Sequence, residues 1–447
     1  MAPRIRMVCS LLALLTSACF VTDTAGRNSS PRPAPTRPSA VAAPGSLDAA
    51  FGDGGRVISG WDGPVDVPYW DIEKAVYGRA FDVEIQNDGR ILVIGARGYG
   101  DAFALARHDP DGSLDPSFGD SGILHTTFPD ASAAFDGAIQ EDGKIVAVGT
   151  AGKSVYASGW SEYPGRPGVA FALARYRPNG DLDSSFGSEG KVLTRFGPDG
   201  SAQANAVEIL PGGGLVVAGS VGGSAGLARY LPDGSLDPSF SSDGKLLIRW
   251  VDRSSLERAS DVAVTADEKI VVGGLACAGR RCSVVVGRYF ADGSPDMSFG
   301  SGGATLVPAR SDRVTDLVIQ SDGKLVLGAG RSVYRFDPDG SLDDSFADDG
   351  TLSGVSASGV AVDTDGAVIV AGPSGPQPWL FAVCRFEPTG VEDPGFGDDG
   401  RATADFPGFL NTPFAVAIQP DGKIVAAGTT SDFNLDAAFA VARFLPV

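Results

Sequence analysis

The chain has 447 residues, a formal net charge of −19, 61 glycines and 30 prolines. This acidity excludes a non-specific nucleic-acid binder, which needs a basic surface, and it disfavours any anionic partner. The length is too great for one ordinary hydrophobic core unless the chain is an array of repeats.

The N-terminus predicts an exported lipoprotein. Arg4 and Arg6 precede a short apolar run, residues 7–17, which is too short to span a bilayer as a stable helix. The run leads into Leu-Thr-Ser-Ala-Cys at 15–19, which resembles a bacterial lipobox. That resemblance implies cleavage before Cys19, acylation of its sulfur and sorting to the outer membrane, with the protein facing the periplasm or the exterior. The alternative is an ordinary cleaved signal with a chance cysteine.

Three segments follow from this pattern. Residues 1–18 are the predicted signal peptide. Residues 19–45, rich in Pro, Ser and Ala, are the predicted disordered and semi-extended tether. Residues 46–447 are the predicted folded domain.

A repeated pattern organises the folded domain. An Arg is followed after eight residues by Asp, after three more by Phe and after four more by Gly, as in Arg107, Asp115, Phe118 and Gly122. The complete copies start at Arg107, Arg175, Arg229, Arg288, Arg335 and Arg385. A repeat unit cannot bury its own hydrophobic face, so neighbouring units must pack against each other.

Each unit is predicted to contain four short strands. In one unit these are residues 123–128, 134–140, 144–149 and 171–176, with a tight Asp-Gly turn between the second and the third. Such units form the blades of an all-β propeller, and seven of them close a ring. A right-handed parallel β-helix is the competing fold, but it has shorter coils and no paired Asp-Gly hairpins.

Three strings carry a family resemblance across residues 46–447. Gln-Pro-Asp-Gly-Lys-Ile-Val at 419–425, Phe-Ala-Leu-Ala-Arg-Tyr at 171–176 and Gly-Ser-Leu-Asp-Pro-Ser-Phe-Gly at 112–119 resemble the delta-60 repeat. This is a bacterial propeller family without a settled biochemical role. The rhythm is also similar to NHL-type propellers, which implies that the innermost strands begin near Ala80, Ala134, Ala204, Ala259, Val314, Ser358 and Pro413.

The seventh repeat is split between the two ends of the chain. Arg443 supplies its first half, and Asp48, Phe51 and Gly55 supply its second half. We therefore expect residues 56–59 to form the outermost strand of the last blade and Arg443 to contact Asp48. This closure would leave no open sheet edge.

Residues present in every unit are predicted to serve the scaffold. The repeated Phe side chains should fill the gaps between blades, and the repeated Arg and Asp should form an ion pair or a turn hydrogen bond. Calcium loops are the alternative for two turns, through Asp109, Asp111 and Asp115 or through Asp337, Asp339 and Asp343. The sister positions hold Arg177, Leu231 and Phe290, which cannot bind calcium, so turn chemistry is favoured. No metal or cofactor is predicted.

Four aspartates share one register near a predicted channel mouth: Asp82, Asp136, Asp261 and Asp316. They could form a partial ring that binds a cation. The favoured interpretation is that they accept hydrogen bonds from backbone N–H groups of the neighbouring blade.

The cysteines agree with export. Cys277 and Cys282 flank a short loop between two strands and are predicted to form a disulfide in an oxidising compartment. Zinc is disfavoured because no other Cys or His of the unit completes a tetrahedral set. Cys384 stands where sister units have Ala, which predicts a small buried side chain.

Catalytic motifs are not evident, and no catalytic residue is predicted. The chain has two histidines, His108 and His125, and neither has a recognisable acid–nucleophile context. Carboxylate pairs of the glycosidase type stay open as an alternative, because spacing alone cannot locate one in so acidic a chain.

Irregular connections are predicted to gather on one face with most of the large aromatics. The candidate binding residues are Trp61, Tyr69, Trp70, Tyr77, Tyr156, Trp160, Tyr163, Trp250 and Trp379. Exposed aromatics on one face indicate recognition of carbohydrate or of a protein surface. The alternative is that long loops bury their own aromatics.

These observations predict a lipid-anchored, monomeric propeller that acts as a binding or scaffold module through its variable loops. The competing hypothesis is a hydrolase or lyase on the same face. An enzyme should show clustered carboxylates or histidines with strongly perturbed pKa values at the channel mouth, whereas a binder should show exposed aromatics without them.

Overall fold

The computed structural model describes residues 42–60, 78–98, 100–152, 169–197, 201–252, 256–309, 313–375, 379–408, 410–431 and 437–447. Residues 42–447 form a compact unit, which begins four residues before the predicted boundary at residue 46. The regular elements of the described ranges are β-strands, and none of these residues lies in a helix long and apolar enough to cross a membrane.

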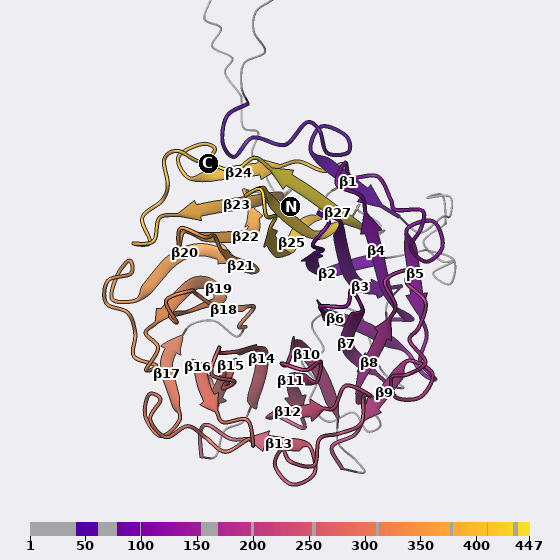
Figure 1. Ribbon diagram of the computed structural model, residues 1–447. Helices are drawn as coiled ribbons and strands as arrows, with labels where there is room; N and C mark the ends of the chain where they lie inside the picture. Colours follow the sequence, from indigo (N-terminus) through magenta and orange to yellow (C-terminus); the bar gives the residue numbers. More distant parts are fainter. Residues whose placement is uncertain are drawn as a thin grey trace, which may run out of the picture. The chain divides into compact units, whose positions relative to one another are not determined.

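The predicted seven-bladed propeller is confirmed. The described strands form seven antiparallel sheets arranged as blades around a centre (Figure 1). The first strand of each blade is the innermost, and it contacts the innermost strands of both neighbouring blades. The innermost strands are β2 (Gly78–Ile85), β6 (Ser132–Ile139), β10 (Ala202–Ile209), β14 (Leu256–Val264), β18 (Leu317–Ile319), β21 (Gly359–Val362) and β25 (Leu410–Ile418).

The remaining strands follow outward in chain order. The second strands are β3 (Ile91–Arg97), β7 (Ile145–Ala151), β11 (Leu215–Val221), β15 (Ile270–Ala278), β22 (Val368–Ser374) and β26 (Ile424–Ser431). The third strands are β4 (Ala102–His108), β8 (Ala170–Tyr176), β12 (Ser224–Tyr230), β16 (Arg281–Tyr289), β23 (Leu380–Phe386) and β27 (Ala437–Phe444). The outermost strands are β5 (Ile123–Thr126), β9 (Lys191–Thr194), β13 (Lys245–Ile248), β17 (Ala304–Ala309), β20 (Thr351–Ala357), β24 (Arg401–Ala404) and β1 (Arg56–Ser59).

The fifth blade departs from this plan. One strand, β19 (Leu325–Phe336), takes the place of both middle strands. Its first half pairs with β18, where Leu317 faces Leu327, and its second half pairs with β20, where Tyr334 faces Thr351. The sheet therefore has three strands, although it covers the same four positions as its neighbours.

The middle strands are buried because each blade is covered by a blade on both sides. Strands β7 and β8 are buried along their whole lengths, so their sequences are continuous apolar runs instead of alternating patterns. The repeated Phe side chains lie in the gaps between blades, and all seven are fully buried, as predicted. Phe118 packs against Gly180 of the next blade, where a Cβ would lie 2.9 Å from the backbone nitrogen of Gly119.

Six of the seven repeated arginines donate to a backbone carbonyl of the next blade. Arg175 Nε donates to Asp183 Oδ2 at 3.0 Å, and its guanidinium lies 4.5 Å from the centroid of the Phe186 ring. Its Nη1 also donates to the carbonyl of Pro232 in the following repeat. The predicted Arg–Asp ion pair is present in all seven repeats.

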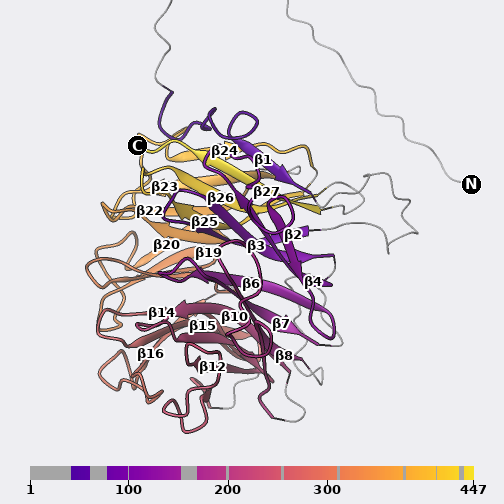
Figure 2. The ribbon, with the colours of Figure 1, turned by 45° about the vertical axis from the view of Figure 1, so that its right-hand side comes forward.

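The ring closes through the two ends of the propeller. Strand β1 pairs with β27 from Arg56↔Ala442 to Ser59↔Phe439, and the two strands lie side by side in both ribbon views (Figures 1 and 2). Arg443 Nε donates to Asp48 Oδ2 at 2.9 Å, which is the predicted closing contact. Pro44 also belongs to the seam, because its carbonyl accepts the N–H of Gly397 at 3.0 Å.

The two faces of the ring differ in their connections. On one face, which we call the constant-turn face, the first hairpin of each blade spans five residues and each complete turn to the outermost strand spans 14. On the other, the variable-loop face, connections range from one residue, at 358, to 18 residues, at 60–77 and 152–169. The lengths of the connections therefore vary on one face of the ring only.

Candidate functional site

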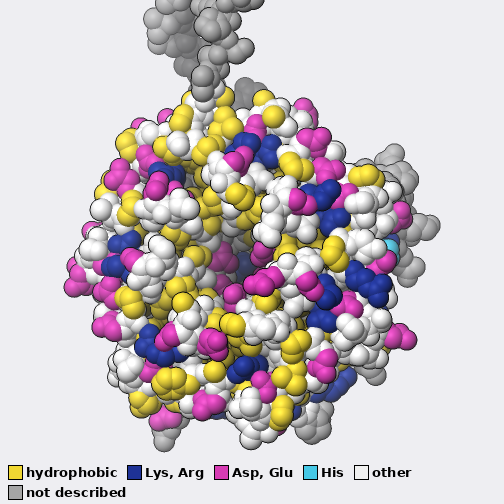
Figure 3. Space-filling view, viewed as in Figure 1, with side chains coloured by type: hydrophobic (Ala, Val, Ile, Leu, Met, Phe, Trp, Pro, Cys, Tyr) yellow, Lys and Arg dark blue, Asp and Glu magenta, His cyan; other side chains and the backbone are white. Residues whose placement is uncertain are grey.

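The innermost strands carry a ring of acidic side chains around the centre of the propeller. The predicted register residues Asp82, Asp136 and Asp261 lie on β2, β6 and β14, and Asp316 immediately precedes β18. All four are partly exposed, and the space-filling view shows acidic side chains in the central hollow (Figure 3). Together with Glu84 on β2 and Glu208 on β10, these four aspartates make up what we call the carboxyl ring.

Each of the four aspartates accepts a hydrogen bond from the next blade, which was the favoured interpretation of the register. Asp136 Oδ2 accepts the N–H of Val207 at 2.7 Å, and Asp316 Oδ2 accepts that of Val360 at 2.6 Å. The remaining pairs are Asp82 with Gly137 at 3.0 Å and Asp261 with Leu317 at 2.5 Å. The carboxylates therefore satisfy backbone donors that the bulged inner edge leaves open.

The ring is interrupted where a repeat lacks the aspartate. The register holds Ala206, Gly359 and Ala415 in the third, sixth and seventh blades. The first aspartate after each interruption also accepts a hydrogen bond within its own strand. Asp82 Oδ1 accepts the N–H of Val83, and Asp261 Oδ1 accepts that of Val262. The aspartates thus link blades one to three and blades four to six as two separate arcs.

Two further carboxyl groups lie on the same strands. Glu84 and Glu208 stand two positions after the aspartate register, and both are partly exposed. Burial raises the pKa of Glu208 to about 7. Burial, with the charge of Asp82, also raises the pKa of Glu84 well above its ordinary value. Sequence reasoning missed both, because only two of the seven repeats carry an acid at this position.

The aspartates of the ring show the same perturbation. Burial raises the pKa of Asp82 to about 6 and that of Asp316 to about 7, against the opposing effect of their backbone hydrogen bonds. Burial and the charges of Asp82 and Asp261 raise the pKa of Asp136 well above its usual range. Burial and the charge of Asp316 do the same for Asp261. Because the charge of one acid raises the pKa of another, these groups titrate as one cluster.

An aromatic group lies beside the carboxyl ring on its variable-loop side. Phe81, Phe135 and Phe414 occupy bulge positions on the inner strands of the first, second and seventh blades, and we call them the phenyl arc. The Phe81 centroid is 5.3 Å from that of Phe135 and 5.7 Å from that of Phe414. All three rings are partly exposed. Arg313, two blades away from Phe414, places its guanidinium 5.8 Å from that ring.

Most of the predicted binding-face aromatics lie outside the described residues. These are Trp61, Tyr69, Trp70, Tyr77, Tyr156, Trp160 and Tyr163. Trp379 is described and partly exposed, and its carbonyl accepts a hydrogen bond from Asn411 at 2.9 Å.

Trp250 is partly exposed, and its indole packs against the fourth blade. Its Nε1 donates to Tyr289 Oη at 3.0 Å. Its indole lies over Gly274 and Gly287, where a Cβ would come within about 3 Å of the ring. Two glycines on different strands create the room for the indole, and spacing along the chain does not show this.

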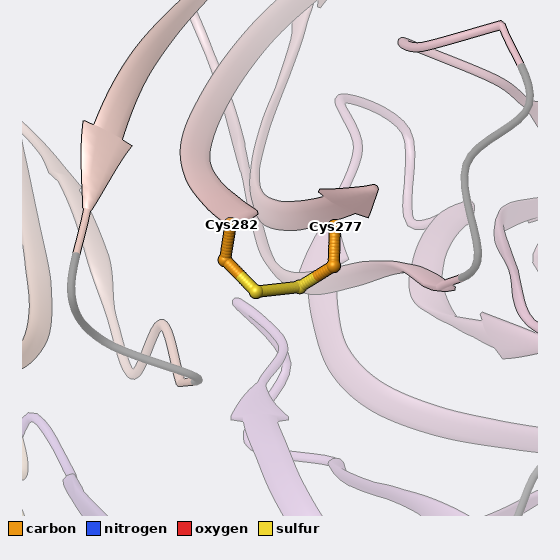
Figure 4. The surroundings of a disulfide bond; sticks show 2 residues. All are labelled: Cys277 and Cys282. Carbon is orange, nitrogen blue, oxygen red and sulfur yellow. A yellow bond between two sulfur atoms is a disulfide. The ribbon is translucent and has the colours of Figure 1, made fainter. Parts of the chain in front are cut away.

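The predicted disulfide is present in the structure. Cys277 and Cys282 are joined where β15 and β16 meet, and they face each other in the strand register (Figure 4). Cys384 is buried and free, as its alanine-like position predicts. The bridge therefore fastens the end of one hairpin on the variable-loop face.

In the two turns considered as calcium loops, the aspartates make hydrogen bonds and ion pairs with neighbouring side chains and backbone. Asp111 Oδ1 accepts the N–H and the hydroxyl of Ser113, and Asp115 pairs with Arg107. Asp337 and Asp343 both contact Lys324. Across the described ranges, no group of three or more His, Cys, Asp or Glu side chains could hold a metal ion.

His108 has a scaffold role that its repeat position explains. It stands where sister repeats have Tyr, and its Nε2 lies 2.7 Å from Ser59 Oγ on β1. Tyr176 and Tyr230 make the equivalent bond to Thr126 and Thr194 of the preceding blade. Burial lowers the pKa of His108 to about 4. His125, on β5, belongs to an outermost strand away from the carboxyl ring.

The repeats match a sequence family whose description is "Domain of unknown function (DUF5122) beta-propeller". The matched residues are 86–118, 140–186, 213–240, 265–299, 320–346 and 419–447. Five of these segments end at the repeated Phe, so the family's unit runs from the first hairpin to the inter-blade Phe. A search of curated proteins by sequence found no match.

A search of solved structures found proteins of several kinds. A protein of unknown function from Dyadobacter fermentans is 10% identical, with 83% of this chain and 96% of that chain covered and a TM-score of 0.47. A gluconolactonase from Xanthomonas campestris is 14% identical, with 87% and 99% covered and a TM-score of 0.38. An ulvan lyase of polysaccharide lyase family PL25 is 10% identical, with 83% and 94% covered and a TM-score of 0.43.

These similarities do not extend the activity of any of these proteins to this chain, and the fold assignment rests on the chain's own strand pairing. Seven sheets in a closed ring and six matched repeat segments agree on one assignment. The chain is a β-propeller built from repeats, and six of its segments match the model of this family.

Proposed function

We propose that the chain is a lipid-anchored propeller of the bacterial cell envelope, built from delta-60 repeats, that acts as a binding or scaffold module through its variable-loop face. The observation that carries this proposal is the phenyl arc. Three partly exposed rings contact one another at the variable-loop side of the inner strands. The other repeats have Asn205, Ser260, Thr315 and Ser358 at the same position. Exposed aromatic groups of this kind are typical of recognition surfaces.

The position of the arc supports this role. Its rings belong to the seventh, first and second blades, which also carry the two longest connections of the chain, residues 60–77 and 152–169. Those connections contain Trp70 and Trp160, which we propose as further contacts. A carbohydrate or protein partner suits such a surface, since aromatic side chains stack on sugars and anchor protein interfaces.

A binding experiment on the arc tests the proposal. The full chain, immobilised, is exposed to detergent-solubilised envelope material and to a glycan array. A variant carrying Phe81→Ser, Phe135→Ser and Phe414→Ser takes the residue that Ser260 and Ser358 provide in sister repeats. We expect a glycan or protein that the wild type retains and the variant loses, with the variant's thermal transition changed by only a few degrees. Equal retention by both proteins would exclude the arc as the binding site.

The proposed tryptophans are tested in the same assay. Replacing Trp70 and Trp160 together with Ala should reduce retention while leaving the thermal transition within a few degrees, as expected for exposed side chains. A large loss of stability would instead identify these rings as packing.

A hydrolase or lyase is the second candidate function, because the carboxyl ring is the kind of clustered, perturbed acids expected of an enzyme. Glu208 is the member of the ring that favours it most. Its pKa, raised to about 7 by burial, suits a general acid or base at neutral pH. The aspartates are less suitable because their oxygens already accept backbone N–H groups. Turnover of a polysaccharide or ester panel that disappears in Glu208→Gln would support an enzyme. Unchanged turnover in that variant would remove Glu208 from the chemistry.

A further inference from the structure

We propose that the carboxyl ring is a proton-responsive joint. It holds blades one to three together, and blades four to six together, more firmly when its acids are protonated and less firmly when they ionise. The proposal rests on the geometry of the inner strands. At four of the seven blade junctions, an aspartate oxygen is the acceptor for a backbone N–H of the neighbouring blade.

Acidic side chains outnumber basic ones around these junctions. The ring contains Asp82, Glu84, Asp136, Glu208, Asp261 and Asp316. Arg313 is the cation whose charge acts on Asp316. Arg79 and Arg258 stand at the position of Arg313 on β2 and β14, on the variable-loop side of the ring. When the six acids ionise, they repel one another across the ring, and that repulsion opposes the blade-to-blade hydrogen bonds.

The acids of the inner strands also act on one another. The charge of Asp82 raises the pKa of Asp136, and the charge of Asp316 raises that of Asp261. These junctions therefore gain a repulsion when their acids ionise.

The direction of the pH effect follows from linkage. The folded-state pKa values of Asp82, Asp316 and Glu208, about 6 to 7, lie above those of unfolded carboxyl groups. The folded protein consequently holds protons that the unfolded chain has released. This contribution to stability is present at low pH and is lost as pH rises through 6 to 7. His108 acts in the opposite direction below its usual pKa of 6.5, because burial lowers its folded-state value.

Thermal unfolding of the full chain at about pH 5.5 and about pH 8 tests the proposal, with the wild type compared with an Asp136→Asn, Asp316→Asn double variant. Asparagine keeps an oxygen that can accept the N–H of Val207 or Val360 but cannot ionise. We expect the wild type to melt several degrees lower at the higher pH and the double variant to lose most of that difference. Because both proteins contain His108, its contribution cancels in the comparison.

A matched control lies outside the ring. Asp111→Asn changes an exposed turn residue whose pKa is held below its ordinary value by the Ser113 hydroxyl. This variant should keep the full pH difference of the wild type. If the double variant does not fold, Glu208→Gln replaces it and should also reduce the difference, since Glu208 has no backbone donor to lose among the bonds described.

Amide hydrogen exchange separates the joint from a general change in stability. Relative to their intrinsic rates, the amides of Gly137, Val207, Leu317 and Val360 should exchange faster at the higher pH. The amides of Gly119 and Gly187, which bond to the next blade on the constant-turn face, should change less. Equal changes at both sets, or a double variant that keeps the wild-type pH difference, would overturn the proposal.

Discussion

In five of the seven repeats, one arginine makes three kinds of contact at once. Arg443 pairs with Asp48, lies 4.5 Å from the centroid of the Phe51 ring and donates to the carbonyl of Pro110 in the next blade. A guanidinium can do this because it is planar and carries several donors in a fixed geometry, whereas a lysine ammonium cannot. The same three groups recur around the ring, which explains why spacing alone reveals the pattern.

We predict that Arg443→Met destabilises the propeller by about 3–5 kcal/mol, because Asp48 would remain buried without its partner. Lys423, whose Nζ lies 3.6 Å from Asp48 Oδ2, should bring the loss towards the lower end of that range. Urea unfolding measures the effect. Arg229→Met is the comparison, because the Arg229 side chain is 23% exposed, against 5% for Arg443, and a more exposed ion pair contributes less to stability. An equal or larger loss at Arg229 would contradict the prediction.

His108 should make the fold sensitive to acid. Its folded-state pKa of about 4 lies below the unfolded value of 6.5, so its contribution to stability is complete above 6.5 and is lost as pH falls towards 4. His108→Tyr introduces the residue that Tyr176 and Tyr230 provide in sister repeats. We expect the variant to keep more of its stability than the wild type between those two pH values, as measured by thermal unfolding. If the variant and the wild type lost stability equally between those pH values, His108 would not be the cause of the acid sensitivity.

The limits of sequence reasoning are also visible at this scale. The burial of Phe118 and the pairing of Arg107 with Asp115 could be predicted because each pattern recurs in every repeat. The packing of Trp250 could not, since its room comes from Gly274 and Gly287 on two other strands. Glu84 and Glu208 were missed because they do not recur, and a non-recurring residue carries no spacing signal.

Among the elements, β1 is separated from its own sheet by almost the whole chain. It pairs with β27 over Arg56–Ser59 and covers an edge that would otherwise be open. Ser59 on the same strand contacts His108 of the first blade. The strand was predictable because the split repeat leaves no residue of the pattern missing. The phenyl arc was not, because a bulge places neighbouring residues such as Phe81 and Asp82 on one side, which an alternating pattern does not reveal.

Removing β1 should cost far more than removing the tether. We expect a chain without residues 20–41 to unfold at the wild-type temperature, since the compact unit begins at residue 42. A chain without residues 42–60 should unfold at a much lower temperature and should associate, because the β27 edge becomes available for pairing. Differential scanning calorimetry and sedimentation velocity measure the two effects. Similar transitions for both deletions would refute the closure.

At the scale of the molecule, the chain enters the propeller on the constant-turn face. Pro44 and Gly45 are bonded to Gly397 and Leu445 in the turns of that face. The variable-loop face, with the phenyl arc beside it, lies at the other ends of the strands from these turns.

The proposed lipid anchor is tested by one substitution. Cys19→Ala should release the protein from the membrane fraction, and continued retention would exclude the lipid anchor.

The seam has a mechanical consequence. A pull on the tether enters the propeller at Pro44 and reaches first the bond between Pro44 and Gly397, and then the hydrogen bonds that join Gly45 and Ser46 to Leu445. Behind them lie the bond between Arg443 and Asp48 and then the β1–β27 ladder. The bonds that complete the ring are therefore also the first to carry the load, so a sufficient force would open the propeller at the seventh blade before it disturbed the other six.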